Sequence, residues 1–364
     1  MTAGDAATRL IAFYLPQYHP IPENNKWWGE GFTDWLNVVR ARPLFPGHQQ
    51  PHLPADLGFY DLRLAEIREA QADLARAYGI HGFCYYHYWF GGKRLLSQPL
   101  DEVLATGKPD FPFCVCWANE NWTRSWDGQE KKVLMRAISS AEDDREHITW
   151  LTNMLRDPRY IRVDGKPIVL VYRVSKLANP RRTATVWREE ARRLGIGEIF
   201  LASVESLKHD RADPAISGFD ASVEFQPDWL ALGQPLTITS EGTKIYSYSD
   251  IVARMLKKGA PGYRRFPCVT TSWDNTARRR RRATVLDGSR PELYEAWLRK
   301  VLANVKASSD PDPLVFVNAW NEWAEGAHLE PCQRWGRAYL EATRRALRIS
   351  ATTPQASRYV DSTG

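Results

Sequence analysis

The chain has 364 residues, of which 43% are hydrophobic and 25% charged, a composition typical of a soluble globular protein. No segment approaches the ~20 apolar residues that span a membrane, and the first residues contain no apolar stretch, so we expect a soluble protein without a secretion signal. The net charge of +6 favours an anionic partner, but the motifs of nucleic-acid-binding modules are missing, so we expect no nucleic-acid binding.

The cysteines of the chain do not indicate a disulfide framework. Five is an odd number, and Cys84, Cys114 and Cys116 lie inside apolar, strand-like runs. Reduced thiols are typical of the cytoplasm, so we predict a cytoplasmic protein.

Eight short, almost continuously apolar runs recur along the chain, and most of them suit strands that are buried on both faces. In chain order they are residues 10–15, 82–88, 111–117, 167–172, 199–204, 219–225, 266–271 and 313–320. Apolar residues at helical spacing lie between them, from Asp61 to Tyr78 and then at about 96–107, 139–156, 180–194, 248–258, 290–306 and 335–347. This alternation predicts the α/β class, with a single (β/α)8 barrel of the TIM type over residues 1–348 and a flexible tail at residues 349–364.

Active sites of such barrels form on the loops at the C-terminal ends of the strands. Four predicted strands end in stretches rich in indoles and polar groups, "GFCYYHYWF", "CWANENWTRSWDG", "TSWDNT" and "VNAWNEWAEGAHLEP". The loop after the first strand, residues 16–60, is much longer than a usual connection, and long loops on this face are usually functional. We therefore expect the functional site here, surrounded by long βα loops.

Tryptophan is unusually abundant, with 15 in the chain. Aromatic rings suit sugars, because the C–H faces of a pyranose are apolar while its hydroxyls need polar partners. Candidates at strand ends or in the first long loop are Trp27, Trp28, Trp35, Trp89, Trp117, Trp122, Trp126, Trp273, Trp320 and Trp323. About half of these are expected to pack the top of the barrel, since large side chains are often buried in part. We expect Trp28, Trp122, Trp126 and Trp273 to lie nearest the ligand.

Other residues at the strand ends are candidates for contacts with sugar hydroxyls. They are Tyr14, Tyr18, His19, Tyr86, His87, Trp117, Asn119, Glu120, Asp274, Asn275 and Asn321. His87 has an alternative interpretation as a core histidine, and Asp274 and Asn275 have an equally good one as caps of the following segment. Glu120 is a rival catalytic residue, because an Asn-Glu pair at a strand end holds the acid/base in many sugar-cleaving barrels.

Two glutamates three residues apart, Glu322 and Glu325, follow the last predicted strand. One helical turn would bring both to one side. Two carboxylates that flank the scissile bond are the standard equipment of glycoside hydrolysis, and unequal desolvation separates their pKa values into acid and base roles. Solvated surface glutamates are the alternative, but the surrounding "NAWNEW" at a strand end favours catalysis.

No cofactor or metal is predicted. His48 and His52 are four residues apart, but "HQQPH" contains a proline, which prevents the helical two-histidine geometry of a metal site. Cys114 and Cys116 have no second pair at zinc spacing. GxGxxG, GxxxxGK[ST] and GxSxG motifs are also missing, so nucleotide cofactors and a serine nucleophile have no signal.

The arginine run from Arg278 to Arg282 is interpreted as a solvated loop. A contact with a phosphate-bearing lipid carrier or with an acidic glycan is the alternative interpretation of its charge.

The sequence resembles the WbsX-like proteins of bacterial polysaccharide gene clusters, which are similar to the endo-α-mannosidases of glycoside hydrolase family 99. The stretches that carry the resemblance are "FYLPQYHPIPENNKWWGEGFTDW", "GFCYYHYWFGGKRLL", "PFCVCWANENWTRSWDG", "SWDNTARR" and "NAWNEWAEGAHLEP". The resemblance implies a (β/α)8 barrel that acts on a glycan with retention of configuration.

For the two glutamates, the resemblance implies an unusual retaining mechanism. Glu322 matches the family 99 residue thought to act as a base on the 2-hydroxyl of the sugar, which gives an anhydro-sugar intermediate. Glu325 matches the residue that serves as acid and then as base. Ala324 stands where the mannosidases have a histidine, so a polar contact is missing or comes from elsewhere, and mannose specificity does not follow.

Three functions compete. The leading one is a retaining, endo-acting glycoside hydrolase on a bacterial surface polysaccharide or its lipid-linked precursor. The alternative is a WbsX-type glycosyltransferase or transglycosylase of lipopolysaccharide O-antigen biosynthesis, although the barrel argues against a sugar-nucleotide transferase. A glycan-binding protein without catalysis is the third, and the two glutamates disfavour it. The predicted partner is an oligosaccharide or polysaccharide, peripheral membrane contact stays open, and no signal indicates an oligomeric state.

Overall fold

The structure of the protein, a computed structural model, describes residues 8–124, 129–279, 281–308 and 310–347. The predicted tail at residues 349–364 and the candidate Trp126 lie outside these residues. Of the helices that are described, none is both long enough and apolar enough to cross a membrane.

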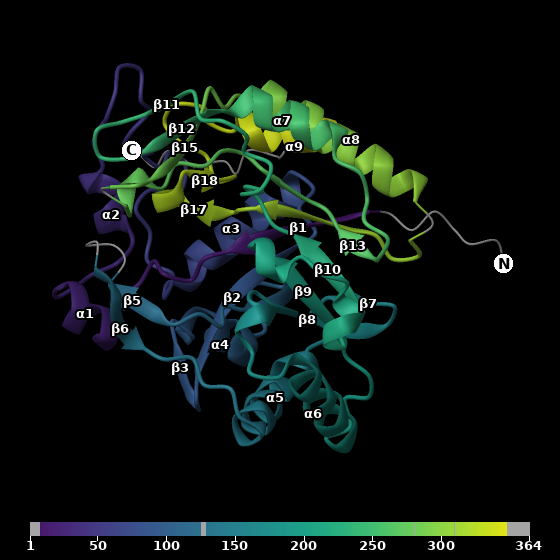
Figure 1. The fold of residues 1–364 in the computed structure, drawn as a ribbon. Helices are drawn as coiled ribbons and strands as arrows, with labels where there is room; N and C mark the ends of the chain where they lie inside the picture. Colours follow the sequence, from purple (N-terminus) through teal and green to yellow (C-terminus); the bar gives the residue numbers. More distant parts are fainter. Residues whose placement is uncertain (1–7, 125–128, 280, 309, 348–364) are drawn as a thin grey trace, which may run out of the picture.

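A parallel sheet forms the centre of the molecule, with helices around it (Figure 1). Its strands, in the order in which they pair, are β13 (Arg265–Phe266), β10 (Ala221–Glu224), β9 (Phe200–Glu205), β8 (Lys166–Val171), β4 (Phe113–Trp117), β2 (Gly82–Phe90), β1 (Arg9–Tyr14), β16 (Leu314–Asn318) and β14 (Cys268–Thr270). Every pair along this path is parallel. Each of the eight predicted strands overlaps this sheet and is confirmed.

The sheet closes on itself at Pro267, which alone separates β13 from β14 along the chain. The two strands at the ends of the sheet are therefore consecutive and together occupy the seventh strand position of a barrel. Proline has no backbone N–H to donate to a ladder, which accounts for the break between them. The predicted barrel is confirmed, and it is closed except for a seam between β10 and β14.

Helices cover the outside of the barrel (Figure 1). They are α3 (Ala65–Ala77), α4 (Gln98–Thr106), α5 (Ala141–Leu155), α6 (Pro180–Arg193), α7 (Tyr248–Lys257), α8 (Pro291–Ala307) and α9 (Ala338–Ala346). Each predicted helical segment contains one of them. The connection between β9 and β10 instead contains two short 3-10 helices, η3 (Lys208–Asp210) and η4 (Pro214–Ser217), so the repeat of strand and helix is incomplete there.

The connections between the barrel strands and the helices carry small elements of their own. The loop after β1 holds two short helices that the sequence did not predict, α1 (Pro22–Trp28) and α2 (Trp35–Arg40). The other small elements are β3 (Lys93–Leu95), β5 (Trp122–Arg124), β6 (Gln129–Met135), β7 (Arg162–Val163), β11 (Thr237–Ile238), β12 (Lys244–Ser247), β15 (Thr284–Asp287), β17 (Asn321–Glu322) and β18 (Ala327–His328), together with the 3-10 helices η2 (Val174–Lys176), η5 (Asn275–Ala277) and η6 (Trp323–Glu325).

The two faces of the barrel strands follow the alternation of a β-strand. Tyr86 on β2 lies beside Cys116 on β4, and this row continues through Leu170 and Ala202 to Ala221. These side chains fill the interior of the barrel in a layer. Side chains that alternate with this row along each strand point outward and face the helices.

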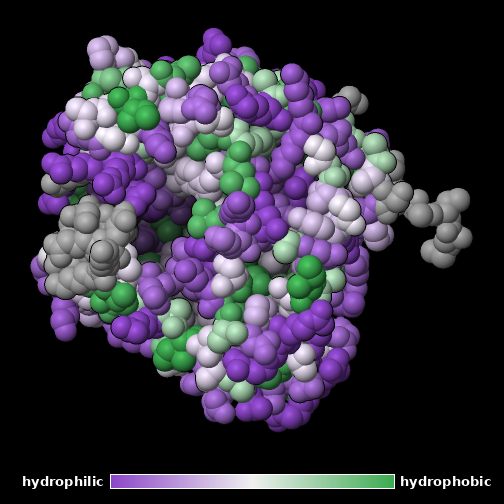
Figure 2. Space-filling view, viewed as in Figure 1, coloured by the Kyte–Doolittle hydropathy of each residue, from purple (hydrophilic) through white to green (hydrophobic). Residues whose placement is uncertain are grey.

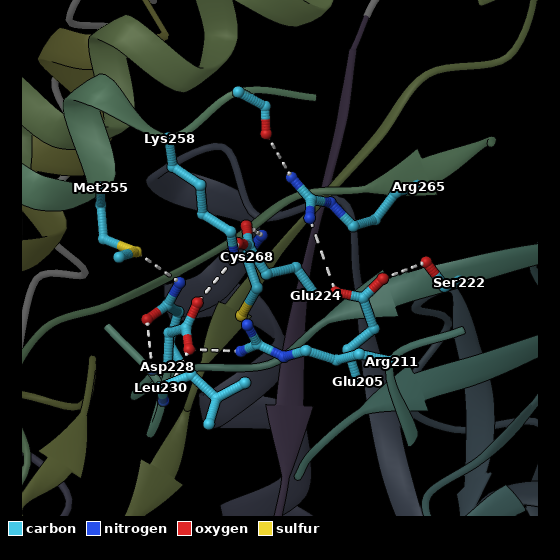
Figure 3. A network of polar contacts seen from close by, with 12 residues as sticks. Glu205, Arg211, Ser222, Glu224, Asp228, Leu230, Met255, Lys258, Arg265 and Cys268 are labelled. Carbon is cyan, nitrogen blue, oxygen red and sulfur yellow. Dashed lines mark hydrogen bonds and ion pairs between the residues drawn. The ribbon is translucent and has the colours of Figure 1, made fainter. Parts of the chain in front are cut away.

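A polar network bridges the seam between β10 and β14 (Figure 3). Glu224, at the end of β10, accepts a hydrogen bond from the backbone N–H of Cys268 on β14 at 3.3 Å. The ammonium group of Lys258 contacts both Glu224 and Asp228, the latter at 2.7 Å, and Arg211 also binds Asp228. Because both carboxylates are almost fully buried, they depend on these cations for stabilisation.

Replacing Lys258 with Met is expected to lower the free energy of unfolding by on the order of 3 kcal/mol, because it leaves two buried carboxylates short of a cation. Urea denaturation measures this. The matched control is Lys257→Met one residue earlier, where the side chain is exposed and a change within about 0.5 kcal/mol is expected. Equal losses in the two variants would contradict the role given to the network.

Candidate active site

A cleft of about 840 Å³ lies where the carboxyl ends of the strands meet. Figure 2 shows a hollow in this face of the molecule, in the region between β5 and β17 of Figure 1. The lining residues come from β2 and from the segments after β1, β4, β8, β10, β14 and β16, and among them are Gln17, Trp28, Tyr86, Tyr88, Asn119, Glu120, Trp122, Tyr172, Lys176, Phe225, Arg278, Arg279, Glu322 and Glu325. The cleft therefore occupies the end of the barrel at which the sequence placed the functional site.

Glu322 and Glu325 stand on a small hairpin that follows β16. The hairpin pairs β17 with β18 in antiparallel fashion and encloses the 3-10 helix η6. Gly326 ends that helix with φ of +62°, a left-handed conformation, and a Cβ atom there would lie 2.9 Å from the backbone nitrogen of Asp274. Only glycine fits this close approach. The backbone N–H of Asp274 donates to the carbonyl oxygen of Glu325 at 2.7 Å and so secures the turn.

The guanidinium of Arg278 connects the two glutamates. Its Nη2 lies 2.9 Å from Oε2 of Glu322, and its Nη1 lies 2.9 Å from Oε1 of Glu325. Nη2 also lies 2.6 Å from Oδ2 of Asp34, whose side chain is fully buried. Three carboxylates thus surround one cation in a site that water reaches poorly. Charges and hydrogen bonds act strongly in such surroundings.

Burial shifts the titration of both glutamates. The pKa of Glu322 is raised to about 8, chiefly by burial and also by the nearby charges of Glu325 and Asp34, while Arg278 opposes the shift. Burial also raises the pKa of Glu325, again against the effect of Arg278. Two interacting carboxylates with raised pKa values share protons and titrate as a pair. Such a pair offers a proton donor and a proton acceptor at the same pH.

Aromatic rings form the inner wall of the cleft. Tyr86 stacks on Phe13 with centroids 5.7 Å apart and meets Tyr172 edge-on at 6.2 Å. Tyr172 in turn meets Phe225 edge-on at 5.3 Å. These residues place flat apolar surfaces beside the two glutamates, an arrangement that suits the apolar faces of a sugar ring.

Glu120 lies on another wall of the cleft and is engaged by a cation. The guanidinium of Arg173 contacts Glu120 and also Asp210, the latter at 2.8 Å. Asn119 holds the same segment, since its amide accepts from the backbone N–H of Arg173 at 2.8 Å and donates to the carbonyl oxygen of Arg173 at 2.8 Å. The ion pair holds the carboxylate of Glu120 in place on this wall, an arrangement that suits a substrate contact.

Several predicted site residues line the cleft as a group. They are Glu322, Glu325, Trp28, Tyr86, Asn119, Glu120 and Trp122. Of the four indoles expected nearest to the ligand, Trp28 and Trp122 lie at the cleft, Trp273 does not, and Trp126 lies outside the described residues.

Other predicted substrate contacts must be corrected, because their side chains point away from the cleft. The Tyr14 hydroxyl donates to Gln71 on α3 at 2.7 Å. A ring nitrogen of His87 lies 3.0 Å from one of His147 on α5. Trp117 packs against Trp187 of α6 with ring centroids 5.7 Å apart. These three residues lie on the helix-facing side of their strands, so the alternative interpretation of His87 as a core histidine is the better one.

Two further candidates support the hairpin that carries Glu322 and Glu325. The Tyr18 hydroxyl donates to the backbone oxygen of Asn321 at 2.7 Å and accepts from the backbone N–H of Trp323 at 3.2 Å. The Asn321 amide bonds both backbone groups of Leu15, accepting at 2.7 Å and donating at 3.0 Å. His19 is also buried and does not line the cleft, and burial lowers its pKa to about 4.

The predicted substrate contacts in the loop after β14 also have structural roles. Asp274 accepts from the backbone N–H of Thr276 at 3.0 Å and thus caps η5, as its alternative interpretation holds. His48 also binds Asp274, with Nε2 2.7 Å from Oδ2. Asn275 accepts from the backbone N–H of Thr284 at 2.8 Å. Trp273 packs edge-on against Trp229 with centroids 5.4 Å apart.

Sequence reasoning missed Arg278 and Asp34. It treated the whole arginine run as a solvated loop, which is correct for the exposed Arg281 and Arg282 but wrong for Arg278. The sequence signal for Arg278 was "SWDNTARR", because the residue that caps η5 directs the chain toward the cleft just before the arginine run. Asp34 lies in the similarly distinctive "GEGFTDW". Within the described residues, no cluster of three or more His, Cys, Asp or Glu side chains is arranged to hold a metal ion.

The arrangement of barrel and cleft has counterparts among solved structures. A glycoside hydrolase family 99 endo-α-mannosidase from Bacteroides thetaiotaomicron is similar with a TM-score of 0.57 and 17% identity, over 94% of this chain and 99% of that one. A glycoside hydrolase-like protein is similar with a TM-score of 0.61 and 14% identity, over 95% of each chain. At these identities the similarity shows a shared fold. The chain is therefore a barrel protein with the architecture of family 99.

The family of the chain follows from its sequence. Residues 10–343 match the family model described as glycosyltransferase WbsX, so the chain belongs to the WbsX family. WxcX of Xanthomonas campestris pv. campestris strain B100 is 45% identical over 347 residues, which make up 93% of this chain and 49% of WxcX. WxcX of strain ATCC 33913 matches to the same extent. The chain thus spans about half the length of these curated relatives.

The stability of the Glu322→Gln variant is expected to fall less than that of wild type as the pH rises. The raised pKa means that wild-type Glu322 stays protonated in the folded state while the unfolded state ionises above about 4.5, so stability falls as pH rises from there to about 8. The loss is at most about 1.4 kcal/mol per pH unit. The Tm of Glu322→Gln minus that of wild type should therefore grow between pH 5 and pH 8.

The control for this measurement is Glu341→Gln, because Glu341 is exposed on α9. Its Tm should follow wild type across the same pH range. A constant Tm difference for Glu322→Gln at all pH values would contradict the buried, protonated state of Glu322.

Proposed function

We propose that the protein is a retaining glycoside hydrolase that cleaves within a bacterial surface polysaccharide or its precursor. The observation that carries this proposal is the pair of glutamates after the last barrel strand, Glu322 buried and Glu325 partly buried, facing an aromatic cleft of about 840 Å³. The barrel fold shared with a family 99 endo-α-mannosidase supports both the reaction class and internal cleavage. Membership in the WbsX family supports a carbohydrate as substrate.

In the proposed reaction the two glutamates act on opposite sides of the reacting sugar unit. Glu322 removes the proton of the 2-hydroxyl, whose oxygen then attacks the anomeric carbon, while Glu325 donates its proton to the leaving glycosidic oxygen. Water opens the resulting anhydro-sugar, Glu325 takes a proton from this water, and Glu322 returns its proton to the 2-oxygen. The side chain of Glu325 is more exposed, at 23% against 6% for Glu322, which suits a residue that meets leaving group and water.

Transglycosylation is the second candidate, and the name of the family favours it. The same two glutamates would serve, with a sugar acceptor in place of water in the second step. A lipid-linked substrate and a cytoplasmic location belong to this version of the proposal, as they would for O-antigen assembly. A purely glycan-binding role is disfavoured by the raised pKa values of two carboxylates at one site.

The deciding experiment incubates wild type and Glu325→Gln with a panel of bacterial O-antigen and capsule oligosaccharides, with and without added acceptor sugars. New reducing ends, detected by mass spectrometry, are expected for wild type and for the control Glu341→Gln but not for Glu325→Gln. Products that are longer than the substrate and that form only with acceptor would identify a transglycosylase. Binding without any turnover under both conditions would overturn the proposal.

The rate of cleavage is expected to depend on pH as a bell-shaped curve. The productive state is the one-proton state of the pair in the arrangement that has the proton on Glu325, which exchanges with the arrangement that has it on Glu322. The alkaline limb should fall near pH 8, where the pair loses its last proton and no acid remains. On the acid side the rate should fall because both glutamates become protonated. A rate that keeps rising above pH 9 would contradict a carboxyl group as the acid.

A further inference from the structure

Three loops of the barrel meet at one side chain in the cleft. Arg278 comes from the loop after β14, Asp34 from the loop after β1, and Glu322 and Glu325 from the hairpin after β16. The side chain of Arg278 is only 10% exposed, although Arg281 and Arg282 of the same arginine run are exposed. The chain thus buries this one cation among three carboxylates.

Asp34 sets the orientation of the guanidinium. Its Oδ2 lies 2.6 Å from Nη2 of Arg278 and its Oδ1 lies 3.4 Å from Nε, so the two side chains meet edge to edge. Asp34 is held in turn by the amide of Asn37, which donates to Oδ1 at 2.8 Å. Its backbone N–H donates to the carbonyl oxygen of Gln17 at 3.3 Å. With this edge fixed, Nη1 and Nη2 present one nitrogen to each glutamate, a fork that lysine cannot reproduce.

On the hairpin itself, the residues between the two glutamates are apolar. Ala324 stands between Trp323 and Glu325 and is fully buried, so it offers no polar group. Arg278 reaches both glutamates from a different loop.

Among the charged groups near the two glutamates, Arg278 contributes most to stabilising their ionised forms. Asp34 opposes ionisation of both, and Arg279 adds a smaller favourable effect on Glu325. The phenols of Tyr18, Tyr86 and Tyr88 face Glu322 and stay neutral, because burial raises their pKa. Without Arg278, three buried carboxylates would face one another and both glutamates would hold their protons at neutral pH. A pair with two protons has no base.

We propose that Arg278 is a positioning residue for the reaction, which holds Glu322 and Glu325 at a set separation and keeps one of them ionised. This inference rests on the proposed function for its catalytic meaning. Its physical content, the ionisation state of the pair, is measurable without any substrate, so its failure and that of the proposed function are distinguishable.

The test is a titration by NMR of protein labelled with carbon-13 at the glutamate side-chain carboxyl. Comparison with Glu322→Gln and Glu325→Gln assigns the two resonances. In wild type, one glutamate of the pair is expected to be ionised near pH 7. In Arg278→Met the lower of the two titration steps should move up by about 1–3 pH units, so that both carboxyls stay protonated at pH 7.

Two further substitutions in the same arginine run distinguish the effect of the charge of Arg278 from the effect of its position. Arg281→Met removes an equal charge from the exposed part of the run and should leave the titration as in wild type. Arg278→Lys keeps the charge without the fork, so its lower step should stay within about one unit of wild type. Once a substrate is found, kcat should fall by about 100-fold in Arg278→Met and Arg278→Lys alike, with a much smaller change in KM.

The proposal is overturned if Arg278→Met titrates like wild type, or if Arg281→Met shifts the pair as much. If Arg278→Met does not fold, Asp34→Asn replaces it. Removing the charge of Asp34 should lower both titration steps, because it opposes ionisation of both glutamates. An unchanged titration in Asp34→Asn would also overturn the proposal, since Arg278 would then not be coupled to the pair.

Discussion

Closure of the parallel sheet is the constraint on which the rest of the structure depends. The chain completes it at the seventh strand, where Pro267 interrupts the ladder and the network around Glu224 bridges the remaining seam. Closure brings β14 next to β16, and β16 next to β1. The loops that follow these three strands are far apart in sequence, yet they become neighbours at one end of the barrel. The cluster of Arg278, Asp34 and the two glutamates exists only because of this adjacency.

The barrel holds this cluster at an energetic cost. Carboxylates are expensive to bury, and the raised pKa values of Glu322 and Glu325 measure that expense. Residues that do not line the cleft keep the hairpin in place, Tyr18 and Asn321 through their side chains and Asp274 through its backbone N–H. Rigid support of this kind lets an active site keep groups that would be more stable in water. The stability of the surrounding barrel offsets the cost.

Much of the fold was predictable, and part of the site was not. Buried parallel strands have long apolar runs, so all eight were recognised. Residues at the strand ends were harder, because a run buried on both faces hides which residues point inward. Tyr86 lines the cleft while its neighbour His87 packs against α5, as strict alternation along β2 requires. Tyr14 and Trp117 were assigned to the site without this test, and both face the helices.

The sequence by itself determined the barrel class and the end of the barrel that carries the cleft, and it singled out Glu322 and Glu325 as the candidate pair there. Those features depend on local periodicity and on residue types that lie together in the chain. Only the tertiary structure decided that Arg278 turns into the cleft while Arg281 stays in solvent. Two members of one arginine run look alike in sequence. Their difference arises from Asp34, a partner more than two hundred residues away, which the closed barrel brings within hydrogen-bonding distance.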